Sequence, residues 1–507
     1  MSTFKTPPEN IVIVGGGSAG WMAASVFLRS LGNSGSKITL IESSNISTIG
    51  VGEGTTPLFK KFLRYLGIPE EEFMSACNAT YKHGINFPGW TNSEEFNTYF
   101  HPFASPAYSQ YDERFFNNCN LRRHGGTANT DPADFFFNAE LAEQRKAPVG
   151  PPSCDADKVG YAYHFDAGLL ADFLKKRSLD QGITHIVDDV TEVNQKDNGD
   201  ISHLVTANSG NISADFFVDC TGFARKLIGE TLDTDIITYK PRLFNDSAVV
   251  IRTPVPENGD IPPFTESRAL KCGWAWRIPL VSRIGWGYVY SADYASPEDA
   301  EKELRDLIGE AAIDLPTRHI RMQVGRVSEH WKNNCVAIGL SQGFIEPLEA
   351  TALGLCQFSI NRFVSHYSRG DYQPTYRDHF NNIVNEAFDC TLDYIHMHYK
   401  LNTREDTEYW RDCRANENIS DTMRAVIAGW DRASDDFMSV LQEHVKGSSY
   451  APYSWYCILS GMGRYPEKTN EQSKNRATNP YHDEVSKYYS HRQYLNSVHK
   501  AQFTGAK

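Results

Sequence analysis

The glycine-rich segment that begins at Gly15 has the spacing needed to bind the phosphates of a dinucleotide. Gly15, Gly17 and Gly20 occupy the glycine positions of a G-x-G-x-x-G pattern, which follows a short apolar run and opens a helical pattern. The first glycine permits a tight turn, the second lets the backbone approach a pyrophosphate, and the third lets the helix pack closely on a sheet. The helix N-terminus at Ser18 and Ala19 would stabilise phosphate charge. We therefore predict a dinucleotide site, against the alternative of a glycine-rich turn without a ligand.

Further loops favour FAD over NAD as the dinucleotide. Glu42 ends the second predicted strand, where a carboxylate would accept hydrogen bonds from ribose hydroxyls. A second glycine-rich loop contains Gly52 and Gly54, and Gly222 and Gly339 follow later strands. These additions are typical of FAD-binding folds of the flavin monooxygenase type. The chain has no second complete fingerprint, which favours a protein that receives its FAD already reduced.

The predicted elements define an α/β, Rossmann-like fold with a mainly helical C-terminal part. Alternating strand and helix patterns open the chain and imply a parallel sheet. We expect strands at residues 11–14, 38–42, 215–220, 248–252 and 336–339, and helices at residues 18–31, 166–181, 352–368, 375–399 and 421–445. The expected parts are a FAD-binding body (1–350) with a strand-rich insertion (about 247–290), a helical substrate-binding part (351–466) and a polar C-terminal arm (467–507). Asp166 is expected to cap its helix.

Composition excludes several other classes of protein. The net charge of −13 argues against nucleic acid or an anionic membrane surface as a partner, because both require a basic face. The N-terminus lacks the plan of a signal peptide, and no apolar run is long enough to span a bilayer. The 10 cysteines are scattered without C-x-x-C pairs, which predicts free thiols rather than disulfides or a metal site. We therefore expect a cytoplasmic protein.

Trp274 and Trp276 form a Trp-x-Trp-x-Ile-Pro motif that ends at Pro279. Taken alone, the motif is an ordinary strand with large apolar residues at alternate positions. Its functional meaning depends on the motifs found elsewhere in the chain.

Together, several motifs resemble those of the flavin-dependent tryptophan halogenases. The first is the segment from Gly16 to Ala24, and the second is the tryptophan pair. The others are residues 80–87 (TYKHGINF), 161–167 (YAYHFDA) and 343–351 (GFIEPLEAT). These matches extend over nearly the whole chain, and their joint occurrence is specific although each is weak alone.

The resemblance implies a mechanism and the residues that perform it. Reduced FAD, O2 and halide yield hypohalous acid, which passes through a tunnel to an electron-rich aromatic substrate. Lys82 matches the family's catalytic lysine, and its amine would activate the hypohalous acid. Glu349 matches a carboxylate that stabilises the cationic ring intermediate and takes its proton. Trp274 and Trp276 would separate flavin from substrate, and Glu346 would lie near the flavin face of this tunnel.

The resemblance also assigns the halide and substrate sites. Backbone N–H groups at Thr351 and Ala352 match the halide site, although tryptophan halogenases commonly have glycine where this chain has Ala352. His101, Phe103 and Trp455 match the residues that hold an indole by stacking. Residues 447–462 show no convincing equivalent of the segment that clamps the amine and carboxylate of free tryptophan. Free tryptophan, indole and a larger indole-bearing molecule therefore all stay open as substrates.

Two alternatives to a halogenase come from the same motifs. One is a flavin monooxygenase that hydroxylates its substrate, and the other is a non-catalytic flavin-binding protein. The tryptophan pair together with Lys82 and Glu349 favours the halogenase. The expected partners are a small aromatic substrate and a separate flavin reductase that forms no stable complex, and an oligomer is compatible with the sequence.

Overall fold

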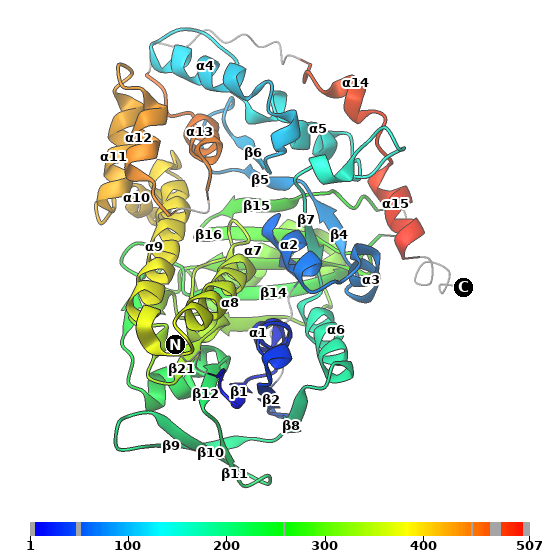
Figure 1. Ribbon diagram of the computed structural model, residues 1–507. Helices are drawn as coiled ribbons and strands as arrows, with labels where there is room; N and C mark the ends of the chain where they lie inside the picture. The colour runs from blue at the N-terminus through cyan, green and yellow to red at the C-terminus, as the bar shows by residue number, and fades with distance from the viewer. Residues whose placement is uncertain (1–5, 47–51, 257–258, 448–449, 467–477, 500–507) are drawn as a thin grey trace, which may run out of the picture.

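A six-stranded sheet with parallel pairing forms one end of the molecule (Figure 1). The computed structural model describes residues 6–46, 52–256, 259–447, 450–466 and 478–499. The strands of this sheet, in spatial order, are β20 (Trp331–Lys332), β21 (Cys335–Ala337), β12 (Phe216–Asp219), β1 (Asn10–Val14), β2 (Lys37–Glu42) and β8 (Thr184–Val187). All neighbours pair in parallel except β20 and β21. The βαβ opening predicted from the sequence is therefore confirmed.

Three helices lie next to this sheet, and the first of them packs against the sheet and against the other two. They are α1 (Ser18–Ser30), α6 (Ala167–Asp180) and α8 (Ala352–Arg369). Asp166 caps α6 as expected, because its carboxylate accepts hydrogen bonds from the N–H groups of Gly168 (2.9 Å) and Leu169 (3.3 Å). Helix α8, which we expected at the start of the helical substrate-binding part, lies against α1.

A seven-stranded sheet occupies the middle of the molecule, with α7 (Pro297–Ile308) beside two of its strands. Its strands, in spatial order, are β18 (Arg318–Arg321), β14 (Ser247–Pro254), β17 (Arg283–Tyr290), β16 (Gly273–Pro279), β15 (Thr265–Leu270), β5 (Gly84–Pro88) and β6 (Thr98–Pro102). The strand-rich insertion predicted at residues 247–290 supplies its centre. Strands β5 and β6 join it from the N-terminal half of the chain.

Three smaller sheets contain the remaining strands of the described residues. The sheet that matters for the site is antiparallel and contains β3 (Glu53–Gly54), β7 (Ala162–Phe165) and β4 (Thr80–Lys82). The other two contain β9 (Val190–Gln195), β10 (Ile201–Thr206) and β11 (Asn211–Ser213), and β13 (Ile236–Thr238), β19 (Gly325–Val327) and β22 (Gly343–Phe344). Helices α2 (Leu58–Tyr65) and α3 (Glu70–Ala76) follow β3 along the chain.

The opposite end of the molecule is helical and draws on both halves of the chain (Figure 1). Its helices are α4 (Asp112–Arg123), α5 (Phe137–Glu143), α10 (Glu408–Ala415), α11 (Asp421–Asp431), α12 (Phe437–His444) and α13 (Pro452–Gly461). The long helix α9 (Arg377–Leu401) connects the two ends, because it contacts α10 and α13 as well as α8 and β20. The helix expected at residues 421–445 is in fact two helices, because Asp436 starts a new one by accepting a hydrogen bond from the N–H of Met438. In the described part of the chain, no helix is both long and apolar enough to cross a bilayer.

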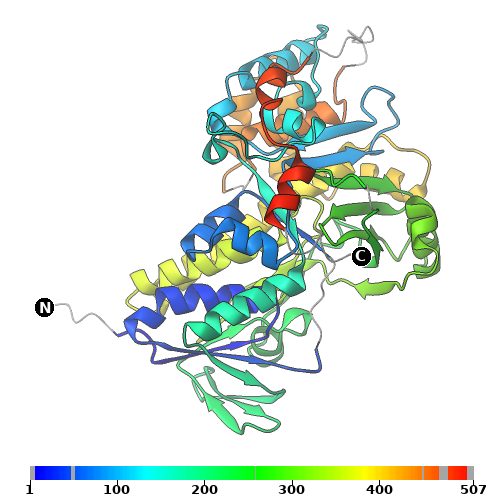
Figure 2. The ribbon, with the colours of Figure 1, turned by 90° about the vertical axis from the view of Figure 1, so that its right-hand side faces the viewer.

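The described part of the expected polar arm packs against the body instead of extending from it. Residues 478–499 contain α14 (His482–Val485) and α15 (His491–Val498), drawn in red beside the rest of the molecule in Figure 2. Tyr481, Val485, Tyr488 and Leu495 are buried in the main core. Most residues between these positions are polar, which hides their helical spacing in the sequence.

Candidate active site

The glycine pattern forms the tight strand-to-helix turn predicted for it. Gly15 has a positive φ of 117°, and a Cβ there would lie 2.1 Å from the carbonyl oxygen of Cys220. A Cβ on Gly20 would lie 1.9 Å from the carbonyl oxygen of Gly15. A Cβ on Gly17 would meet nothing within 4 Å, so the backbone at Gly17 has open space in front of it. Gly15 and Gly20 therefore shape the turn, and Gly17 leaves room for a ligand.

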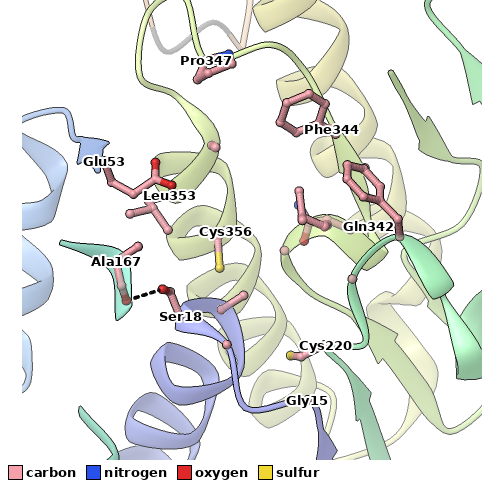
Figure 3. Close-up of a pocket in the computed structure, with 18 of the residues that line it drawn as sticks. Gly15, Ser18, Glu53, Ala167, Cys220, Gln342, Phe344, Pro347, Leu353 and Cys356 are labelled. Carbon is pink, nitrogen blue, oxygen red and sulfur yellow. Dashed lines mark hydrogen bonds between the residues drawn. The ribbon is translucent and has the colours of Figure 1, made fainter. Parts of the chain in front are cut away.

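This turn opens on a cavity of about 730 Å³, a volume suited to a large cofactor (Figure 3). The cavity lining includes nearly all the residues predicted to bind FAD, namely Gly15, Gly17, Ser18, Ala19, Glu42, Gly52, Gly54, Gly222 and Gly339. Gly20 is not part of the lining, in keeping with its role in packing. The N-terminus of α1 faces this space, where its free N–H groups could bind a pyrophosphate. The residues present therefore fit a flavin dinucleotide.

Two carboxylates line the cavity, those of Glu42 and Glu53. Glu42 accepts hydrogen bonds from Lys175 (2.6 Å) and His185 (2.8 Å) through one oxygen, Oε1. Glu53 points into the cavity in Figure 3 and was not predicted. Burial and the nearby charge of Asp166 raise the pKa of Glu53 to about 7. Glu53 is therefore a carboxyl group that can donate a hydrogen bond to a cofactor near neutral pH.

Trp274 and Trp276 line the same cavity from β16, together with Ile278. The two indole rings lie 6.0 Å apart at an angle of 55°. Trp276 pairs with Gly287 on β17, and a Cβ at Gly287 would lie 2.0 Å from the Trp276 ring, so this glycine makes room for the indole. The pair thus forms part of the wall of the nucleotide cavity.

Glu346 fixes the first of these tryptophans. Its Oε2 accepts hydrogen bonds from Trp274 Nε1 (3.2 Å) and Asn245 Nδ2 (2.8 Å). Burial raises the pKa of Glu346, although hydrogen bonds from Asn245, Tyr399 and Trp274 oppose the shift. Glu346 therefore orients the Trp274 indole from a buried polar network.

Lys82 is the last residue of β4, and its side chain is completely buried. Its Nζ makes no hydrogen bond within the described residues and lies 5.4 Å from the centre of the Phe103 ring. A Cβ on the cavity residue Gly54 would lie only 3.1 Å from Nζ. Burial lowers the pKa of Lys82 to about 7, although the negative charge of Glu349 opposes the shift. A buried amine beside the cavity, without a hydrogen bond, is available to a small ligand.

Glu349 lies between β22 and α8, where it is held by two histidines from distant elements. His101 Nδ1, on β6, lies 3.0 Å from both carboxylate oxygens, and His398 Nε2, on α9, lies 3.4 Å from Oε1. Burial alone would raise the pKa of Glu349, but the charges and hydrogen bonds of His101 and His398 outweigh it and hold the pKa at about 2. Glu349 is therefore ionised at neutral pH.

Of the residues predicted to hold an aromatic substrate, Phe103 adjoins Lys82 and His101 adjoins Glu349, while Trp455 packs on Tyr394, whose ring lies 5.8 Å from that of His101. Phe103 faces the Lys82 amine, as described above. Trp455 on α13 is buried, its ring stands perpendicular to Tyr394 at 5.1 Å, and its Nε1 has no hydrogen-bond partner in the described residues. His101 has its two ring nitrogens occupied by Glu349 and by Ser454 Oγ (3.0 Å), so it holds the carboxylate in addition to any stacking role.

The predicted halide residues lie where α8 begins. Thr351 is the residue before the helix, and Ala352 is its first residue and lines the nucleotide cavity. Ala350 before them has a positive φ of 57°. The free N–H groups of this helix start are suited to a small anion on the cavity side.

Sequence reasoning missed His491 and His499, two C-terminal residues that bind the backbone of the segment carrying Lys82. His491 Nε2 accepts a hydrogen bond from the N–H of Tyr81 (3.2 Å), and His491 Nδ1 donates to the carbonyl of Ile261 (2.8 Å). His499 Nε2 donates to the carbonyl of Ala79 (2.9 Å). The C-terminal segment therefore binds the strand that carries Lys82. These histidines lie in a polar stretch without a motif, so no sequence signal marks them.

The fold and site define a nucleotide-binding protein in which a tryptophan wall and a buried lysine–glutamate pair adjoin the cofactor cavity. The chain matches the model of the family described as "Tryptophan halogenase" over residues 10–478, and it belongs to this family. This finding confirms the resemblance stated above.

Named relatives agree with this assignment. The chain is 39% identical to Tryptophan 6-halogenase SttH of Streptomyces toxytricini over 477 residues, which covers 90% of each chain. It is 34% identical to Tryptophan 7-halogenase RebH of Lentzea aerocolonigenes over 483 residues, again with 90% of each chain covered. BrvH, a flavin-dependent halogenase from Brevundimonas sp. BAL3, superimposes with a TM-score of 0.83 at 30% identity, over 97% of this chain and 99% of that one. The protein is therefore a flavin-dependent halogenase.

Proposed function

We propose that this enzyme halogenates the electron-rich ring of indole or a tryptophan-like substrate, using FADH2, O2 and halide. The observation that carries the proposal is the Lys82 amine, which is buried, has no hydrogen-bond partner within the described residues, and lies close to the cavity residue Gly54 and to the ring of Phe103. Reduced FAD, when bound, would supply two electrons and halide two more, and O2 would accept all four to give hypohalous acid and water.

The chain's own residues would then direct that acid. Trp274 and Trp276 keep an organic ring away from the flavin, while a small oxidant passes to Lys82. The Lys82 ammonium donates a hydrogen bond to hypohalous acid and makes its halogen more electrophilic; as a neutral amine it forms a haloamine instead. A pKa of about 7 lets Lys82 adopt either state near neutrality.

Glu349 would act on the substrate after halogen transfer. As the carbon–halogen bond forms, the oxygen–halogen bond of hypohalous acid breaks, and its oxygen leaves as hydroxide that is protonated to water. The ring is left cationic, and the carboxylate stabilises it by its negative charge. The ring carbon then loses its proton and regains aromaticity. A carboxylate with a pKa of about 2 is a weak base, but the cationic ring is a strong acid, so this base suffices.

The residues that match the family's substrate site support an aromatic substrate held by Phe103, His101 and Trp455. The described residues 450–462 contain no lysine, arginine, aspartate or glutamate that could bind the charged groups of free tryptophan. Indole or a larger indole-bearing molecule is therefore the favoured substrate. The relatives named above as tryptophan 6- and 7-halogenases keep free tryptophan in the test panel.

The test is product analysis with a separate flavin reductase. Purified protein, FAD, NADH, the reductase and O2 are supplied with chloride, bromide and iodide in turn, over a panel of indole, tryptophan and larger indoles. Mass spectrometry should show a monohalogenated product that is lost in Lys82→Ala, while FAD binding is retained. Lys61→Ala, at an exposed position on α2, is the matched control. Oxygenated product without a halide requirement would instead identify a hydroxylase, and halogenation at the wild-type rate by Lys82→Ala would contradict the role of the lysine.

A further inference from the structure

Three buried side chains form a hydrogen-bonded chain that ends at the cavity beside Lys82. Thr80 on β4 and His164 on β7 face each other in the small antiparallel sheet, and Thr265 is the first residue of β15. Thr80 Oγ1 lies 2.7 Å from the carbonyl oxygen of Pro279 and 3.2 Å from His164 Nδ1. His164 Nε2 lies 2.8 Å from Thr265 Oγ1. The chain therefore links the carbonyl that ends the tryptophan strand to a hydroxyl of the cavity wall.

The direction of every hydrogen bond in this chain follows from the Pro279 carbonyl. A carbonyl oxygen can only accept, so the single hydroxyl proton of Thr80 is donated to it. Thr80 Oγ1 can then only accept from the ring of His164, and Nδ1 carries the ring proton. Burial lowers the pKa of His164 well below 6.5, and the charge of Lys82 acts in the same direction, so the ring is neutral and Nε2 is an acceptor. Thr265 must therefore donate its own hydroxyl proton to His164.

This arrangement leaves Thr265 Oγ1 with lone pairs, and no proton to donate, close to the Lys82 amine. Thr265 is part of the lining of the nucleotide cavity. The position that a Cβ on Gly54 would take lies 3.1 Å from Lys82 Nζ and 3.6 Å from Thr265 Oγ1. The amine makes no hydrogen bond to Thr265 or to any other described residue. A donor and an oxygen that can only accept therefore lie close to the same position beside the cavity.

We propose that Thr265 is a further catalytic residue, whose hydroxyl oxygen accepts a hydrogen bond from the O–H of hypohalous acid while the Lys82 ammonium donates to the oxygen of that acid. The inference rests on the proposed function. The two contacts use the only proton of hypohalous acid and hold its oxygen, so the halogen stays free to meet the substrate. When the ring attacks, the oxygen–halogen bond breaks, and the oxygen keeps the electron pair, takes a proton from Lys82 and leaves as water. Thr265 neither gains nor loses a proton in this step.

The inference is tested by measuring how much hypohalous acid escapes from the enzyme. The full-length enzyme turns over the best halide and aromatic substrate of the panel above, with a 1,3-diketone trap in solution, and the ratio of halogenated trap to halogenated substrate is measured. Thr265→Val removes the hydroxyl at nearly constant volume and should raise this ratio about fivefold, the factor that one neutral hydrogen bond contributes. Thr265→Ser keeps the hydroxyl and should match the wild type. Thr391→Val is the control, because it removes a buried hydroxyl that donates to the carbonyl of Ala387 (2.7 Å) outside the cavity lining.

The same assay separates lost retention of the acid from damaged folding. Thr265→Val leaves His164 Nε2 without its donor, so FAD binding and the melting temperature are measured as well, and Thr265→Ala carries the same expectation if valine impairs folding. Damaged folding lowers both products together, whereas lost retention changes their ratio. An unchanged ratio in folded Thr265→Val, or an equal rise in Thr265→Ser, would overturn the inference and leave the proposed function intact. A wild-type enzyme that forms no halogenated product would overturn both.

The orientation of the Thr265 hydroxyl is tested without turnover by ring-15N NMR of the histidine-labelled, full-length protein. At pH 7.5 we expect His164 to carry its proton on Nδ1 and to have an unprotonated Nε2. Its signals are identified by their response to substitution, because Thr80→Val should shift mainly Nδ1 and Thr265→Val mainly Nε2. A proton on Nε2 in the wild-type protein would make Thr265 a donor toward the cavity and would refute the inference.

Discussion

Lys82→Met should inactivate the enzyme and at the same time stabilise its fold, by an amount that depends on pH. Burial lowers the pKa of Lys82 from 10.5 to about 7, so folding is opposed by the cost of burying a cation or releasing its proton. The penalty is about 5 kcal/mol well below pH 7, about 4 kcal/mol at pH 7 and about 2 kcal/mol at pH 9. It vanishes as the pH rises past the unfolded pKa, because neither state then holds the proton.

Methionine has a similar length and no charge, so Lys82→Met should be more stable than the wild-type protein at pH 7. Denaturant unfolding of both proteins is measured from pH 6 to 9.5, and the difference in unfolding free energy is plotted against pH. Other ionisable groups largely cancel in that difference. We expect the advantage of the variant to shrink by about 2 kcal/mol between pH 7 and 9.

The exposed Lys61→Met provides the baseline and should show no such trend. A difference between Lys82→Met and wild type that stays constant with pH, or that grows as the pH rises, would refute the reasoning. Either result would mean that Lys82 does not lose a proton on folding.

Four other substitutions test the geometry of the site. Gly17→Ala should fold normally but weaken FAD binding, because its Cβ enters open space in the cavity. Gly20→Ala should instead reduce folding stability, because its Cβ would lie 1.9 Å from a backbone oxygen. FAD titration and thermal melts distinguish the two effects. Gly54→Ala should lower kcat about tenfold, since its Cβ would lie 3.1 Å from Nζ of Lys82. The kcat is measured at saturating FAD, and an unchanged value would contradict that crowding. His491→Phe should lower the free energy of unfolding by about 2 kcal/mol, because it leaves one buried N–H and one carbonyl without a partner. Gln493→Ala, at an exposed position, is the control. An unchanged melting temperature of His491→Phe would argue against a stabilising contact between His491 and the strand of Lys82.

The amino-acid sequence by itself determined those features that depend on local backbone conformation and periodicity. The turn at Gly15 and Gly20 follows from glycine spacing, because any Cβ at these positions would meet backbone. The capping of α6 by Asp166 needs only a carboxylate within reach of the next N–H groups. Joint motifs along the chain also identified the family, now shown by the match over residues 10–478.

Local sequence patterns gave wrong predictions where packing against distant segments determines the structure. The stretch after residue 477 looks polar along the sequence, yet Tyr481, Val485, Tyr488 and Leu495 reach the core. The predicted long helix at residues 421–445 divides at Asp436, where a cap competes with helix continuation. Neither result is visible from hydrophobic periodicity alone.

Only the tertiary structure decided the electrostatics of Lys82 and Glu349, the two residues proposed to act in catalysis. Glu349 meets His101, which lies 248 residues away in the chain, and the strand of Lys82 meets His491, which lies 410 residues away from Tyr81. Such contacts carry no sequence signature, because a histidine in a helix or a tail has the same local pattern whether or not it faces a carboxylate. The identity of Lys82 and Glu349 could be inferred from motifs, but burial and long-range partners set their charges.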